Sequence, residues 1–147
     1  MKPQDIENIE LQYLTLDDYQ ELKGAMQQAY KSMPNLFWRE NQIKTLIEKF
    51  PEGQVVIKIN NQIAGCALSI IVDYDEFDEI HTYEDITGNY TFNTHDADKG
   101  DALYGIDVFI KPEFRGLRLG RRLYDYRKEL CEKLNLRGIA FGGRIPN

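Results

Sequence analysis

One long apolar run limits what this chain can fold into. Between Ile63 and Val72, only Gly65 and Ser69 interrupt a series of Ile, Val, Leu, Ala and Cys residues. A strand of this composition has no polar face to present to water, so both of its faces must be covered by protein. We therefore expect it to be an inner strand of a layered fold.

The segments around this run complete an order of elements. Residues 54–59 and 62–72 are expected to form two strands joined by Asn60 and Asn61, since asparagine tolerates the positive φ of a two-residue hairpin turn. The other expected elements are a strand at 8–14, a helix opened by Thr15 with Asp18 as its capping-box partner, a helix from about 38 to 50, a strand at 103–110, a helix from about 120 to 134 and a strand at 136–141. This order predicts an α/β (α+β) fold.

Length and composition exclude several classes of protein. A chain of 147 residues with 42% hydrophobic and 29% charged content fits one globular domain. No apolar run reaches the roughly 18 residues of a membrane span, so we expect no membrane partner and a cytoplasmic location. Cys66 and Cys131 are expected to be buried free thiols, with a lone disulfide as the alternative. No metal site is predicted, because His81 and His95 lack partners at metal-ligand spacing.

The charge is unevenly distributed along the chain. The formal net charge of −6 argues against nucleic acid as a partner, yet residues 111–147 hold ten Lys and Arg against four acidic residues. Residues 73–101 hold ten acidic residues and one Lys, together with several aromatic residues. We interpret the basic end as a site for an anion, with a solvated helix face as the alternative. The acidic stretch is expected to be an ordered excursion with a short helix and a hairpin.

The basic end contains a strand-turn-helix segment suited to phosphate. The strand that ends at Ile110 leads through a turn at 111–114 into the sequence Arg-Gly-Leu-Arg-Leu-Gly-Arg at 115–121, which opens a helix. The first N–H groups of a helix have no partners within it, and small residues beside them let the backbone wrap around a phosphate. The glycine spacing fits neither a Walker loop nor a dinucleotide fingerprint. The segment therefore predicts a site for a di- or triphosphate ester.

Residues 108–121 resemble the acetyl-CoA signature of the GNAT acyltransferase superfamily. That signature is a strand, a Pro-containing turn and then Arg/Gln-x-x-Gly-x-Gly/Ala at the start of a helix. Arg115 and Gly120 match its first and last positions, whereas Arg118 stands where the middle Gly usually lies. The resemblance implies a single acetyl-CoA-binding domain over 1–147, with a GNAT-like mixed central sheet flanked by helices. Three stretches, at 87–92, 118–124 and 142–146, also resemble bacterial proteins in which a GNAT domain precedes a carbon–nitrogen hydrolase domain.

The resemblance implies transfer of an acetyl group from acetyl-CoA to an amine that attacks the thioester directly. The pyrophosphate of the cofactor would lie on the amides of the helix start, and its pantetheine arm would run beside the end of the strand. A backbone N–H there would stabilise the developing oxyanion. The implied cofactor-binding residues are Phe109, Ile110, Arg115, Gly116, Leu117, Arg118, Leu119, Gly120 and Arg121.

The group that accepts the ammonium proton is left open between two residues of the strand. Tyr104 stands where some relatives place a catalytic Glu, and Asp107 is the nearest carboxylate on the strand. The alternatives are a packed aromatic residue for Tyr104 and a hydrogen-bonded strand acid for Asp107. The acidic excursion adds Glu84, Asp85, His81 and His95 as further candidates. It also favours a cationic amine as the acceptor, with a solubilising loop as the alternative.

Two other functions and one structural expectation remain. The chain is alternatively a non-catalytic CoA-binding regulatory module of a larger or fused enzyme, or a domain that binds another phosphorylated ligand at the same helix end. In the family, the strand expected at 136–141 is followed by a Tyr-bearing helix and further strands. We therefore expect a domain truncated at its C-terminus, whose exposed sheet edge would pair with a second copy to form a homodimer.

Overall fold

The computed structural model describes residues 8–33, 37–73, 87–88 and 91–141, and a five-stranded mixed sheet forms its centre. The strands follow one another in chain order across the sheet, and neighbouring strands are antiparallel except for the parallel last pair. They are β1 (Ile9–Tyr13), β2 (Val55–Ile59), β3 (Gln62–Val72), β4 (Ala102–Ile110) and β5 (Gly138–Phe141). The predicted mixed α+β architecture is confirmed.

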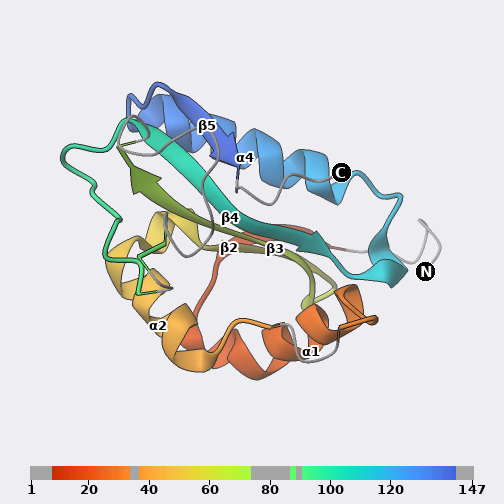
Figure 1. Ribbon diagram of the computed structural model, residues 1–147. Coiled ribbons are helices and arrows are strands. Elements are labelled where there is room, and N and C mark those ends of the chain that lie inside the picture. Colours follow the sequence, from red (N-terminus) through yellow and green to blue (C-terminus); the bar gives the residue numbers. More distant parts are fainter. Residues whose placement is uncertain (1–7, 34–36, 74–86, 89–90, 142–147) are drawn as a thin grey trace.

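Helices cover both faces of this sheet (Figure 1). The helices α1 (Tyr19–Ala29) and α2 (Glu40–Lys49) pack on one face, and α4 (Leu119–Lys133) packs on the other against β3, β4 and β5. Three short 3₁₀ turns, η2 (Leu16–Asp18), η3 (Pro51–Gly53) and η5 (Pro112–Phe114), connect them to the sheet. Within the described part of the chain, no helix is long and apolar enough to cross a membrane.

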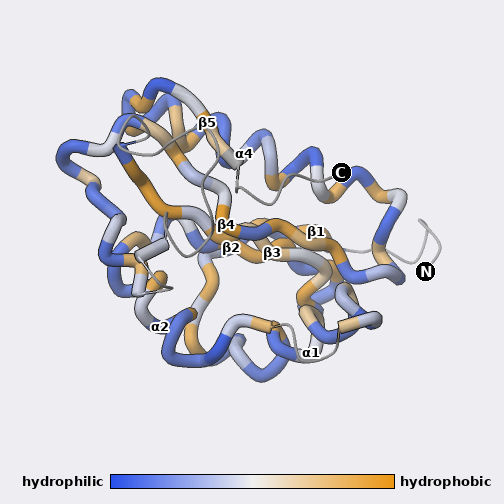
Figure 2. The backbone as a smooth tube through the Cα atoms, viewed as in Figure 1, coloured by the Kyte–Doolittle hydropathy of each residue, from blue (hydrophilic) through white to orange (hydrophobic). Residues whose placement is uncertain are grey.

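The apolar run of β3 lies at the centre, as predicted. Every residue from Ile63 to Val72 is buried, and the apolar strands form the hydrophobic middle of the molecule between outward-facing polar helix surfaces (Figure 2). Leu68 and Ile70 join a core with Leu22 of α1 and Leu46 of α2, and alternate strand residues face α4 instead. Burying apolar side chains on both faces is the main stabilising contribution of this strand.

The hairpin between β2 and β3 also has the predicted form. Asn60 and Asn61 have φ of 50° and 67°, the left-handed conformation that a two-residue hairpin turn requires at both positions. The side chain of Asn60 additionally accepts a hydrogen bond of 3.0 Å from the backbone N–H of Asn8. This turn sets the register in which Ile59 lies opposite Gln62.

Two predicted boundaries shift by a few residues because capping groups occupy them. The predicted Thr15–Asp18 capping box is present, but it closes the 3₁₀ turn η2, and α-helical geometry begins only at Tyr19. At the other end, α4 closes with Asn135 in a left-handed conformation and Leu136 N–H bonded to the carbonyl of Cys131. Because this C-cap uses residues up to 136, the last strand starts at Gly138.

The structure describes both cysteines but only part of the acidic excursion. Cys66 and Cys131 are buried free thiols, as expected, and burial raises the pKa of both. Within the excursion at 73–101, residues 74–86 and 89–90 lie outside the described residues, so its expected helix and hairpin stay a prediction. Its described end folds back on the domain, since Phe92 is buried and contacts the ring of Trp38.

His95 ties the excursion to β3. Its Nδ1 accepts a hydrogen bond of 3.0 Å from the backbone N–H of Ile71, and its ring stacks on Phe50 with 5.1 Å between centroids. Burial lowers the pKa of this imidazole below its ordinary value, and nearby Lys49 acts in the same direction. The folded protein therefore holds His95 neutral at a pH where the unfolded chain already binds a proton.

This asymmetry predicts a loss of stability in mild acid. The contribution of neutral His95 is complete above the unfolded pKa of about 6.5 and is lost as the pH falls toward the lowered folded pKa. The variant His95→Asn keeps an acceptor for Ile71 but has no proton to bind. Urea unfolding at several pH values measures the free energy of unfolding of both proteins. We expect the parent to lose more of this free energy than the variant between about pH 7 and about pH 5. Parallel curves would contradict the assignment.

Candidate functional site

Among the described residues, β5 pairs with only the first part of β4. The paired residues of β4 are Ala102 to Gly105, and β4 then continues to Ile110 with no described strand beside it. We call this second part of β4 the open edge. The N–H of Lys111 donates to the Ala64 carbonyl at 2.8 Å, so the backbone groups of Lys111 point toward β3. In an antiparallel pair, successive residues alternate between pointing toward and away from the partner strand.

That alternation decides which backbone groups face the open edge. The N–H and C=O of Val108 and of Ile110 point away from β3, whereas those of Phe109 point toward it. The side chain of Phe109 is buried in the core on the α1–α2 face. Of the two strand residues expected to contact the pantetheine arm through their backbone, Ile110 therefore presents outward groups and Phe109 does not. Val108 is the second outward residue.

A tight loop joins the end of β4 to α4. Phe114 anchors it, since its ring is buried with Leu119 and Leu123 of α4. Gly116 has φ of 90° and Arg118 has φ of 60°, so the backbone turns twice through left-handed conformations before the helix begins. Arg118 thus adopts the conformation that glycine takes most easily, at the position where the family motif usually has glycine.

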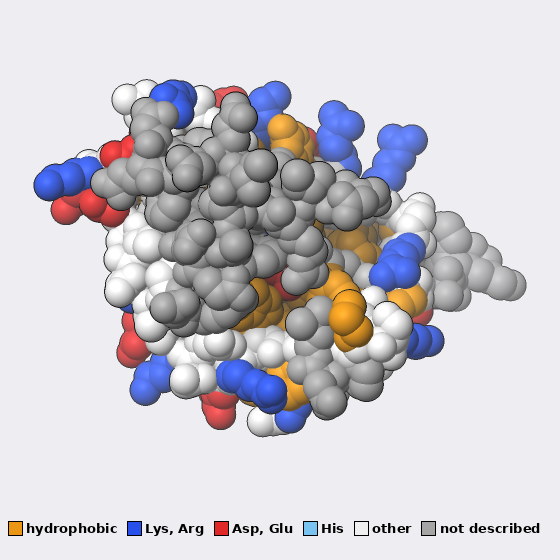
Figure 3. Space-filling model, viewed as in Figure 1, with side chains coloured by type: hydrophobic (Ala, Val, Ile, Leu, Met, Phe, Trp, Pro, Cys, Tyr) orange, Lys and Arg blue, Asp and Glu red, His pale blue; other side chains and the backbone are white. Residues whose placement is uncertain are grey.

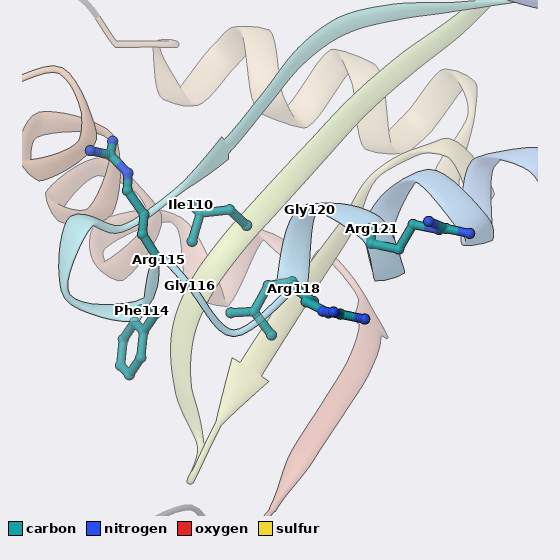
Figure 4. A pocket seen from close by; sticks show the side chains of 8 residues that line it. Ile110, Phe114, Arg115, Gly116, Arg118, Gly120 and Arg121 are labelled. Atoms are coloured by element: carbon teal, nitrogen blue, oxygen red, sulfur yellow. The ribbon is translucent and has the colours of Figure 1, made fainter. Parts of the chain in front are cut away.

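A depression of about 390 Å³ lies at the start of α4 (Figure 4). Figure 4 shows the side chain of Arg115 on one side of it and those of Arg118 and Arg121 on the other. A Cβ atom added at Gly116 or Gly120 would meet no atom within 4 Å, so the backbone there is open to close approach. The lining residues are Ile110, Phe114, Arg115, Gly116, Arg118, Leu119, Gly120 and Arg121.

This arrangement is suited to an anion, and we call it the anion cradle. The first N–H groups and the dipole of the 15-residue helix α4 favour negative charge at its start, and three arginines line the same space. Arg121 also forms an ion pair of 3.3 Å with exposed Asp125, one turn further along the helix. The predicted loop residues therefore come together, with the exception of Leu117, whose side chain packs against the core beneath α4. Lys and Arg side chains project from the edge of the molecule formed by α4 (Figure 3).

The second part of the site is a β-bulge in β4. Leu68 lies opposite Asp107 and Ser69 lies opposite Gly105, so Ile106 is an extra residue in the ladder. The bulge changes which face the following side chains occupy. Asp107 consequently points to the α1–α2 face, the same face as the preceding Ile106.

Two aromatic side chains hold the Asp107 carboxylate. The Tyr30 hydroxyl donates to Oδ1 at 2.7 Å, and the Trp38 indole N–H donates to Oδ2 at 3.0 Å. The Tyr30 ring also lies 6.0 Å from that of Phe109. Both donors are neutral, and within the described part of the chain no ion pair involves Asp107. The carboxylate is thus oriented by two neutral donors, which lie at the two ends of the segment that joins α1 to α2.

The other predicted proton acceptors have different surroundings. Tyr104 is fully buried in the core between the sheet and α1–α2, with no exposed surface. His95 holds the β3 backbone, as described above. Glu84, Asp85 and His81 lie outside the described residues. No group of three or more potential metal ligands occurs among the residues that the structure describes.

Sequence reasoning missed three residues of this site. Tyr30, Trp38 and Arg127 have no role in the predicted site, yet all three contact Asp107, and Arg127 is only 3% exposed. A signal for Arg127 was present, because it follows Leu123 by four residues and precedes Leu130 by three. A charged residue on the apolar stripe of a helix indicates a buried polar contact.

The fold thus combines a mixed five-stranded sheet, helices on both faces and a basic loop at the start of α4. The model of the acetyltransferase (GNAT) family matches residues 11–147, and the chain belongs to this family.

Two relatives from Bacillus subtilis (strain 168) are similar to it. The chain is 40% identical over 110 residues to "Probable hydrolase YhcX", and the match covers 75% of this chain and 21% of that protein. It is 33% identical over 111 residues to "Uncharacterized N-acetyltransferase YkwB", which covers 76% of this chain and 49% of that protein. The chain thus spans about a fifth and about half of these relatives. The longer one carries a hydrolase name, in agreement with the predicted resemblance to GNAT–hydrolase fusion proteins.

Solved structures show the same fold. The loading GNATL domain of CurA from Lyngbya majuscula superimposes with a TM-score of 0.69 at 22% sequence identity. The match covers 85% of this chain and 59% of that one.

Replacing Arg118 separates its charge from its backbone strain. Both Arg118→Ala and Arg118→Gly remove the guanidinium, but only glycine relieves the left-handed conformation, which costs other residues about 1 kcal/mol. We expect the glycine variant to be more stable than the alanine variant by roughly that amount in urea unfolding. Equal stability of the two variants would show that the loop relaxes when the side chain is shortened.

Proposed function

We propose that this domain transfers an acetyl group from acetyl-CoA to a primary amine. The observation that carries the proposal is the continuity of the site: the anion cradle at the start of α4 leads directly onto the open edge of β4, and that edge leads to the bulge at Asp107. A ligand with a phosphate-rich head and a long polar arm that ends in a reactive group fits this order.

The donor would be held along this line by backbone groups. Its pyrophosphate would accept hydrogen bonds from the first amides of α4 and from the surrounding arginines. Its pantetheine amides would pair with the outward N–H and C=O groups of Ile110 and Val108, along the part of β4 that has no described strand beside it. The thioester would then lie beside the bulge.

The acceptor would approach from the α1–α2 side, where Asp107 is the charged group. A carboxylate with two neutral hydrogen-bond donors attracts an ammonium ion and can accept one of its protons, which frees the nitrogen lone pair to attack the thioester carbon. The new C–N bond replaces the C–S bond, and the CoA thiolate leaves with the second proton that the nitrogen loses. We favour Asp107 over Tyr104 as the proton acceptor, because the side chain of Tyr104 is fully enclosed in the core.

The acceptor is proposed to be cationic. The Asp107 carboxylate supports this preference, and the acidic residues of the excursion act in the same direction. A panel of cationic, neutral and anionic amines assayed with acetyl-CoA tests it. A preference for neutral or anionic amines would contradict it.

The alternative is a CoA-binding module without turnover that serves a larger enzyme. Both functions predict that acetyl-CoA raises the melting temperature, because a ligand at a hundredfold excess over its Kd stabilises the folded state by about 2.7 kcal/mol. Only the acetyltransferase predicts free thiol released in proportion to added amine. A location in the cytoplasm and a place within a larger enzyme are further parts of this proposal.

A pair of glycine substitutions tests the cradle. Gly120 and Gly24 each lie in a helix with open space beyond the Cα atom, and they lie on opposite faces of the sheet. Gly120→Asp places a carboxylate at the proposed pyrophosphate position, so we expect acetyl-CoA affinity to fall by at least about tenfold in calorimetry. Gly24→Asp makes the same change of charge away from the cradle and should bind like the parent. Equal binding by all three proteins would refute the cradle.

Asp107→Asn tests the proton acceptor. The amide is nearly isosteric with the carboxylate but cannot take up the ammonium proton. We expect kcat, measured as amine-dependent thiol release, to fall by about a hundredfold while the Kd of acetyl-CoA stays within about twofold. The control is Tyr104→Phe, which retains the packed ring and should keep substantial activity. A larger loss in the tyrosine variant would reverse the assignment.

A further inference from the structure

Arg127 is a buried cation on the inner face of α4. It is 3% exposed and follows Leu123 on the side of the helix that packs against the sheet. One guanidinium nitrogen, Nη2, donates to the carbonyl of Leu68 on β3 and to the carbonyl of Asp107 on β4, each at 2.8 Å. Burying a guanidinium is costly unless hydrogen bonds compensate for its lost hydration. The two carbonyls supply such bonds.

These two carbonyls belong to the residues that face each other at the bulge. The extra residue Ile106 interrupts the ladder there, so regular interstrand pairing is lost on one side of the Leu68–Asp107 pair. Arg127 bridges both strands at this point. It therefore fixes the geometry of the bulge from the α4 side, while Tyr30 and Trp38 hold the Asp107 side chain from the other side.

The contact also determines where the neighbouring N–H groups point. In a trans peptide the C=O and the N–H are directed oppositely. The Leu68–Ser69 peptide shows this: its carbonyl meets Arg127, and its N–H donates in the other direction to the buried Gln54 side chain at 3.0 Å. By the same geometry, the Asp107–Val108 peptide has its carbonyl on Arg127 and its N–H directed at the open edge of β4.

We propose that Arg127 is a positioning residue for acyl transfer. Its positive charge on the Asp107 carbonyl polarises the Asp107–Val108 peptide and aims the Val108 N–H at the thioester oxygen of the donor, where negative charge develops. One buried guanidinium thus orients both the oxyanion donor and the residue that carries the proton-accepting carboxylate. This inference rests on the proposed function, because it presumes a thioester at the open edge.

The test reads the thioester carbonyl directly, so that it does not depend on turnover. Acetyl-CoA labelled with ¹³C at the carbonyl is bound to the parent, to Arg127→Met and to Arg127→Lys, and the carbonyl stretching frequency is recorded by isotope-edited infrared spectroscopy. A hydrogen bond from the Val108 N–H lowers this frequency relative to free acetyl-CoA. Leu130→Ala, another truncation on the buried face of α4, serves as the packing control.

We expect the frequency of the parent to be lowered, that of Arg127→Met to return toward the free value, and that of Arg127→Lys to lie between them. Leu130→Ala should keep the parental frequency even though it melts at a lower temperature. In turnover, Arg127→Met should lose at least about tenfold in kcat, with the KM of acetyl-CoA within about twofold.

Three results would overturn the proposal. They are an unchanged frequency in both Arg127 variants, a Leu130→Ala spectrum that matches that of Arg127→Met, or a change in KM without a change in kcat. If Arg127→Met does not fold, the comparison between Arg127→Lys and the parent decides alone. Acetyl-CoA binding to the parent with an unshifted carbonyl would refute this inference and leave the cradle intact, whereas absence of binding would refute the proposed function itself.

Discussion

Within the described residues, the end of the β4–β5 ladder at Gly105 is the constraint on which the rest of the structure depends. A strand that loses its neighbour within a sheet leaves N–H and C=O groups without ladder partners, and a protein tolerates this where something else pairs with them. Here the same opening is followed by a loop that delivers three arginines to the start of α4. The open edge and the cradle therefore lie next to each other along the chain.

Much of the fold could be predicted because the responsible interactions are local. The apolar run at Ile63–Val72 required cover on both faces, and Asn60 and Asn61 supplied the positive φ of a tight hairpin. The anion cradle was predictable for the same reason, since glycines and arginines at a helix start act through their own backbone and charge. These features depend on neighbours in sequence and need no knowledge of distant contacts.

The orientation of Asp107 was less predictable, because it depends on a single extra residue in β4. Strand alternation alone would place Asp107 on the same face as Leu103 and Gly105, and the bulge at Ile106 reverses this. Gly105, directly before the extra residue, is a weak signal for that bulge, because glycine inside a strand often marks one. Its partners come from elsewhere, with Tyr30 at 77 residues and Trp38 at 69 residues from Asp107 in the sequence. Contacts over such distances are invisible to periodicity.

The two helical layers contact different groups around Asp107 of β4. In the proposed reaction, donor binding depends on the α4 side of β4, whereas the surroundings of the Asp107 side chain come from Tyr30 after α1 and Trp38 before α2. Substitutions in the α1–α2 layer would then change which acceptor binds without altering the binding of the donor. The peptide between Asp107 and Val108 is held from the α4 side through its carbonyl, and the Asp107 side chain is held from the α1–α2 side, so a substitution at this point would affect both substrates.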